Sequence, residues 1–98
     1  MAQQKYILNK GRILLGLVDY HRQIIKDHTD TVGGGLWEIK DDKLYLFGKS
    51  MDFGSPYIAD VKKAVMPQYK FGGIEVYFTD RLSNELTEDI IKASVRVK

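Results

Sequence analysis

The chain has 98 residues, enough for one domain, and no cysteine, which excludes disulfides, thiolate metal sites and a cysteine nucleophile. With 44% hydrophobic and 29% charged residues, its composition is that of a folded globular protein. A net charge of +2, spread along the chain, argues against a nucleic-acid partner, and no apolar run is long enough to span a membrane. The first five residues lack the apolar core of a signal peptide, so we expect a cytoplasmic protein.

The N-terminal third predicts two strands followed by a helix. Residues 5–9 and 12–18 are short apolar runs, and Gly11 between them allows a tight hairpin or a longer bend. Asp19 is a candidate N-cap for a helix over residues 20–28, because its carboxylate can accept hydrogen bonds from the first free backbone N–H groups.

The middle of the chain predicts a second hairpin. Gly33–Gly35 permits positive φ or close approach of another backbone. Residues 36–40 then form one strand, residues 40–43 form a polar turn, and Leu44–Phe47 form a continuous apolar strand. Four apolar residues in a row favour a strand that is covered on both faces.

A helix and a strand are predicted after this hairpin. Ser55 and Pro56 have the pattern of a helix start, with serine as N-cap and proline at the first helical position. Pro67 would end this helix, and residues 74–78 read as a strand.

The C-terminal tail, residues 81–98, is ambiguous. Its apolar residues with helical spacing are Leu82, Leu86 and Ile90. Ser83 or Thr87 could cap such a helix, and Val95 and Val97 alternate like a last short strand. Together the elements predict a single α/β or α+β domain, with a mixed sheet and two or three helices packed on it.

The loop after the apolar strand is a candidate anion site. Gly48-Lys49-Ser50 stands between a strand and a helix start, an arrangement that presents backbone N–H groups to an anion. A nucleotide-binding P-loop needs a glycine five residues earlier, where Lys43 stands, so ATP or GTP hydrolysis is excluded. A looser phosphate site between Gly48 and Gly54 remains open, and so does an ordinary strand-to-helix turn.

His21 and His28 are the only histidines. Seven residues place them two turns apart on a helix, too far to share a metal ion, so we expect no metal site. Either could be a general base, because imidazole titrates near neutral pH. Packing at an interface for His21 and a surface position at a helix end for His28 are the structural alternatives.

Three segments, met in order along the chain, carry a resemblance to a known family. They are Lys5-Tyr6-Ile7-Leu8, Asp19-Tyr20-His21, and the triple glycine Gly33–Gly35 followed by residues 43–54. Each resembles the corresponding segment of the Janus/ocnus family, whose best-known activity is the dephosphorylation of phosphohistidine. The resemblance covers about residues 5–80 of a single domain over residues 1–98, with residues 81–98 as a C-terminal extension.

The resemblance implies hydrolysis of phosphoramidates, without metal or cofactor, on a phosphohistidine-containing protein or a small phosphoramidate. His21 would be the general base that activates a water molecule. The phosphate-binding residues would be Lys5, Ser50, Met51, Asp52 and Arg12. Lys5 and Arg12 would supply charge, Ser50 its hydroxyl, and the loop its backbone N–H groups, which are sufficient parts for phosphoryl transfer.

Two other functions remain open. Well-known family members carry arginine where Leu36 stands and often a small residue where Asp52 stands. Because a carboxylate repels a phosphate, the same pocket could be a binding module for a phosphorylated or acidic partner, without turnover. Alternatively the chain is a structural protein whose apolar tail, at Leu86, Ile90 and Ile91, forms a homo-oligomer contact.

Overall fold

The computed structural model of the chain describes residues 2–66 and 73–98. The first four strands of its sheet form two hairpins. The strands are β1 (Gln3–Asn9), β2 (Arg12–Val18), β3 (Thr31–Lys40), β4 (Lys43–Phe47), β5 (Glu75–Phe78) and β6 (Val95–Arg96). Lys10 and Gly11 connect β1 to β2, while Asp41 and Asp42 connect β3 to β4. All four connecting residues have positive φ, between 51° and 74°, as two-residue hairpin turns require. The predicted second hairpin is confirmed, and the first has a tight turn.

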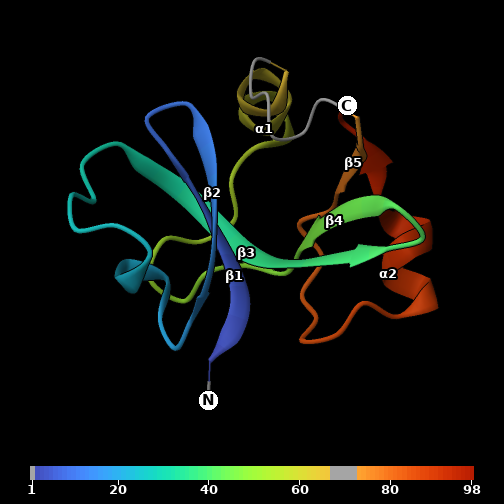
Figure 1. Ribbon diagram of the computed structural model, residues 1–98, viewed down its shortest axis with the longest axis horizontal. Coiled ribbons are helices and arrows are strands. Elements are labelled where there is room, and N and C mark those ends of the chain that lie inside the picture. Colours follow the sequence, from blue (N-terminus) through green and yellow to red (C-terminus); the bar gives the residue numbers. More distant parts are fainter. Residues whose placement is uncertain (1, 67–72) are drawn as a thin grey trace.

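The strands are ordered β2-β1-β3-β4-β5-β6 across one sheet (Figure 1). Among the strands that the structure describes, the β4–β5 pair alone is parallel, so the sheet is mixed. With the helices α1 (Ile58–Val65) and α2 (Glu88–Ala93) it forms one compact α+β domain, the class that the sequence predicts. Among the described residues, no helix has the length and apolarity needed to cross a membrane.

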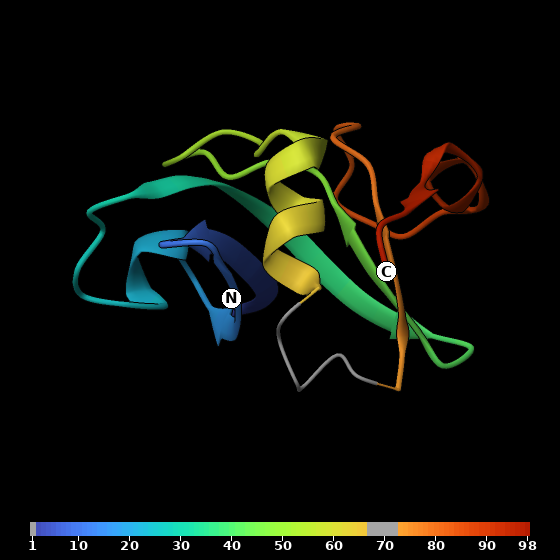
Figure 2. The same cartoon turned by 90° about the horizontal axis from the view of Figure 1, so that it is seen from above.

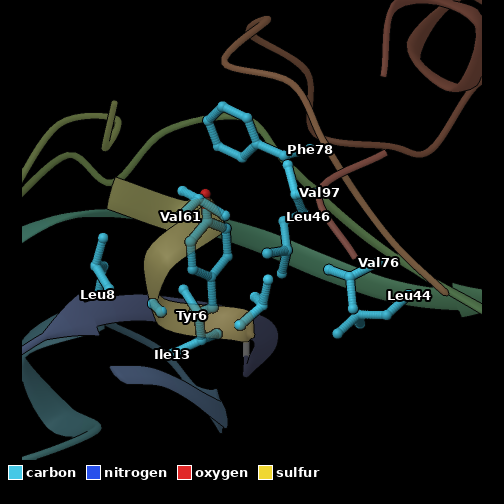
Figure 3. Packing of buried hydrophobic residues seen from close by; sticks show 11 residues of the cluster. Tyr6, Leu8, Ile13, Leu44, Leu46, Val61, Val76, Phe78 and Val97 are labelled. Carbon is cyan, nitrogen blue, oxygen red and sulfur yellow. The ribbon is translucent and has the colours of Figure 1, made fainter. Parts of the chain in front are cut away.

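The two faces of the sheet are covered by different segments. On one face α1 closes the main core, whose buried members are Tyr6, Leu8, Ile13, Leu44, Leu46, Val61, Ala64, Val65, Val76, Phe78 and Val97 (Figure 3). Figure 2 shows α1 over the middle of the sheet, with α2 beside its C-terminal strand. Since successive strand residues point to opposite faces, Tyr45 and Phe47 leave the α1 side and pack with Ile90 of α2. All four residues of Leu44–Phe47 are buried, as expected for a strand covered on both sides.

The helix expected over residues 20–28 is wrong. Only a single 3₁₀ turn, η1 (His21–Gln23), forms there, and its N-cap is Tyr20 rather than Asp19. The side-chain oxygen of Gln23, the last residue of η1, accepts hydrogen bonds from the backbone N–H groups of Asp19 and Tyr20, at 3.0 and 2.8 Å. Further along, the Asp27 carboxylate accepts from the N–H two residues on, so side chains supply the backbone with partners other than helical ones.

The predicted start of α1 is also wrong. The helix begins at Ile58, after an extended residue without a side-chain cap, rather than at Ser55 and Pro56. The Ser55 hydroxyl instead donates to the Gly48 carbonyl at 3.2 Å, which ties this segment to the end of β4. Pro67, expected to end the helix, lies outside the described residues.

The tail contains a helix and a short strand, although α2 begins after Leu82 and Leu86, which the helical spacing had included. Thr87 is the N-cap of α2 and accepts from the Ile90 N–H at 3.3 Å, while β6 pairs antiparallel with β5. Ile90 is buried with Tyr45 and Phe47 of the sheet, and Leu86 and Ile91 are half-buried against this cluster. The described part of the tail is therefore integrated into the domain.

Candidate functional site

A pocket of about 460 Å³ lies on the sheet face opposite α1. Its floor includes Lys5 of β1 and Leu36 of β3, which are directly opposite each other in the sheet. One wall is residues 19–22, around η1, and another is residues 82–84, which precede α2. The pocket is thus the space left between the two segments that cover this face.

The triple glycine allows groups from β1, β4 and η1 to approach β3 closely. A Cβ atom on Gly34 would lie 2.4 Å from the Tyr6 carbonyl oxygen and 3.2 Å from the His21 ring. One on Gly35 would lie 2.3 Å from the Phe47 carbonyl oxygen. Because any side chain would displace these groups, the predicted close backbone approach is confirmed, although the glycines lie within β3.

His21 is the buried titratable group of the pocket, with 5% of its surface exposed. Its Nε2 lies 2.7 Å from the Gly35 carbonyl oxygen. A carbonyl only accepts hydrogen bonds, so Nε2 carries a proton, and the neutral ring keeps its basic lone pair on Nδ1.

Burial sets the charge state of His21. It lowers the pKa of the imidazole below its usual 6.5, against the opposing effect of the hydrogen bond to Gly35. The positive charge of Lys5 lowers this pKa further, and the negative charge of Asp52 raises it. At neutral pH the ring is therefore uncharged and able to accept a proton.

Three cationic side chains line the same pocket from three segments: Lys5, Arg22 and Lys49. The Lys5 ammonium donates to the Asp19 carbonyl and lies 5.9 Å from the centroid of the Tyr20 ring. The Arg22 guanidinium lies 5.7 Å from the same centroid. The pocket therefore offers positive charge beside a neutral base, a combination suited to an anionic ligand.

The loop after β4 contributes to the pocket, but not through Ser50. This hydroxyl is buried and accepts from the backbone N–H groups of Asp52 and Phe53, at 3.1 and 3.0 Å. The Ser50 N–H donates to the Gly34 carbonyl at 3.0 Å. Ser50 is absent from the pocket lining, whereas Met51 and Asp52 are part of it. Two of the three expected loop donors thus already have partners within the chain.

Other residues expected near a phosphate lie elsewhere. Arg12 pairs with Asn9 in the sheet, four strand residues from the Lys5–Gly16 pair, or about 13 Å along β2. The N-terminal residues of α1, Tyr57 and Ile58, line a different cavity. Neither this helix end nor Arg12 therefore reaches the pocket.

His28 lies outside the pocket as well. Its Nε2 is 2.7 Å from the Arg22 carbonyl oxygen, and its ring meets Phe53 edge-on, with centroids 5.5 Å apart. The described residues contain no group of three or more His, Cys, Asp or Glu side chains that could hold a metal ion.

Sequence reasoning missed several residues of the pocket. Arg22 and Lys49 each adjoin an expected site residue in the sequence, and that adjacency was a usable signal. Leu82 comes from the tail, and nothing in its spacing placed it beside η1. Comparisons of the chain with protein-family models, curated proteins and solved structures gave no match.

Proposed function

We propose that the chain is a phosphoramidate hydrolase that acts on phosphohistidine or a related P–N compound, with His21 as general base. The observation that carries this proposal is the buried, neutral His21, fixed on the Gly35 carbonyl, in one pocket with Lys5 and Arg22. The resemblance of the segments around Lys5, His21 and Gly48–Gly54 to the Janus/ocnus family is an independent support. A cytoplasmic location stays a prediction.

In the proposed reaction, the cationic side chains hold the phosphoryl oxygens. A water molecule attacks phosphorus, and its proton passes to Nδ1 of His21. The P–N bond electrons leave with the nitrogen group, which is already protonated in the substrate and departs neutral. The Gly35 carbonyl stabilises the imidazolium that forms, because the charged ring is a stronger donor than the neutral one. Phosphoryl transfer depends mainly on positioning and electrostatic stabilisation, which these groups can supply.

The test is phosphate release from a phosphohistidine peptide by wild type and by His21→Ala. Loss of a general base lowers such rates by about 100-fold or more. His28→Ala is the matched control, since His28 is the other histidine and lies outside the pocket. Equal rates for wild type and His21→Ala would show that His21 is not the base.

A binding module is the second candidate, favoured by one observation. Asp52 lies 3.6 Å from Arg22 at the pocket, so part of the positive charge is already neutralised, and the floor residue Leu36 is apolar. Titration with a non-hydrolysable phosphohistidine analogue, together with the turnover assay, separates the two candidates. Saturable binding without phosphate release would favour the module.

A further inference from the structure

The pocket carries both signs of charge. Asp52 lines the pocket together with Lys5, Arg22 and Lys49, and its Oδ1 lies 3.6 Å from Nη2 of Arg22. Its negative charge partly opposes the lowering of the His21 pKa by burial. Asp52 therefore acts on the candidate base as well as on Arg22.

The backbone position of Asp52 is fixed by the fold. Its N–H is bonded to the buried Ser50 hydroxyl, and the Ser50 and Gly54 backbones hydrogen-bond to each other. Both are also bonded to Gly34, whose carbonyl accepts from Ser50 and whose N–H donates to the Gly54 carbonyl, at 3.0 and 2.8 Å. The loop is thus attached to β3, and hydrogen bonds hold in place the backbone that carries the Asp52 carboxylate.

The Arg22–Asp52 ion pair can exchange partners at little cost. The side chains of Arg22 and Asp52 are 63% and 27% exposed, and a single contact of 3.6 Å between such groups is weak. A purely anionic ligand would gain from the cations but be repelled by Asp52. A ligand with a positive nitrogen beside its phosphoryl group would be attracted by both.

We propose that the pocket selects zwitterionic phosphoryl compounds, with Asp52 binding the positively charged nitrogen and Lys5, Arg22 and Lys49 binding the phosphoryl oxygens. This specificity rests on the proposed function, because a phosphoramidate protonated on nitrogen is such a zwitterion. For that substrate the reaction is R₂HN⁺–PO₃²⁻ + H₂O → R₂NH + H₂PO₄⁻. The carboxylate favours the protonated nitrogen, which leaves as a neutral amine with the electron pair of the P–N bond.

The test compares two stable ligands of equal size by calorimetric titration, 2-aminoethylphosphonate and propylphosphonate. Wild type is expected to bind the aminoethyl compound about tenfold more tightly, a difference of about 1.4 kcal/mol. In Asp52→Asn this preference should disappear, and propylphosphonate should bind more tightly than it does to wild type. Asp41→Asn, on the β3–β4 turn outside the pocket, is the control that should leave both affinities unchanged.

The proposal would be overturned if wild type bound the two ligands equally well or bound neither of them. An unchanged preference in Asp52→Asn would overturn it as well. The experiment does not need turnover, so it separates this inference from the proposed hydrolase. Selective binding without phosphate release would support the zwitterion site and contradict the proposed hydrolase. His21-dependent phosphate release without selective binding would support the hydrolase and contradict the zwitterion site.

Discussion

On one face of the sheet α1 closes a continuous core, while on the other η1 and the segment before α2 leave a pocket between them. The closed face buries Leu44 and Leu46 almost completely. On the pocket face Tyr20 and Leu82 remain 59% and 66% exposed, and Met51 is 91% exposed. The difference separates two tasks, because tight packing stabilises the domain while incomplete packing leaves room for a ligand.

Tyr6 on the closed face and His21 on the pocket face are two buried titratable side chains with contrasting surroundings. On the closed face the Tyr6 hydroxyl points toward Val61 (Figure 3) and has no hydrogen-bond partner among the described residues. Burial raises the pKa of Tyr6 far above its usual value of 10, so the phenol stays neutral. On the pocket face His21 has a fixed partner in Gly35. Only the histidine is therefore held in a defined orientation and able to exchange a proton near neutral pH.

The largest expected effect is a difference in stability between leucine truncations on the two faces. Leu46→Ala should lower the free energy of unfolding by about 3 kcal/mol, because it leaves a cavity in the closed core. Leu36→Ala, in the half-buried pocket floor, should cost about 1 kcal/mol, since solvent can fill the space. Urea denaturation of both variants measures this; equal losses would mean that the pocket face is as tightly packed as the other.

A smaller effect, of opposite sign, is expected at Tyr6. Tyr6→Phe should raise the free energy of unfolding by about 1 kcal/mol, because it removes a buried hydroxyl that no described residue satisfies. Tyr57→Phe is the matched control, since Tyr57 is exposed. A loss of stability in Tyr6→Phe would instead indicate that the hydroxyl has a partner, such as a bound water.

The smallest expected effect on stability is its dependence on pH through His21. The pKa of His21 is lower in the folded chain than the 6.5 of the unfolded chain, so the unfolded state binds a proton first as the pH falls. The stabilisation is complete above pH 6.5 and is lost as the pH falls through the folded-state pKa. Urea midpoints at pH 7.5 and 5 should show a smaller decrease for His21→Gln than for wild type. His28→Ala should retain the wild-type decrease; an identical decrease in His21→Gln would contradict the assignment.

Local sequence patterns were sufficient for most of the strands. The apolar run at 44–47, the alternation in 36–40 and turn residues that tolerate positive φ lie within a few residues of each other. They were sufficient to predict β4 and the second half of β3, but residues 31–35 of β3 were not expected as strand. The helix at 20–28 was wrongly predicted: only the single turn η1 forms there, and the Gln23 side chain caps the start of that turn. The start of α1 was missed because Ser55 bonds to Gly48 rather than to the helix.

The candidate site was only partly predictable for the same reason. His21 and Lys5 were identified from their residue types and from the resemblance, and the structure brings both to one pocket. Ser50 was expected in that pocket, but its hydroxyl is buried and holds the loop. Which groups a polar side chain meets depends on segments distant in the chain, and spacing along the sequence cannot show this.

The α+β class, the hairpins and a candidate base could be predicted from the sequence, because each depends on residues close together in the chain. The pocket could not, because it exists where η1 and the segment before α2 stop short of each other in the folded chain. The tertiary structure also placed Asp52 beside Arg22 and turned Ser50 away from the pocket. These features arise when strands far apart in sequence pair and fix the distances between their loops, so they follow from packing rather than from any local pattern.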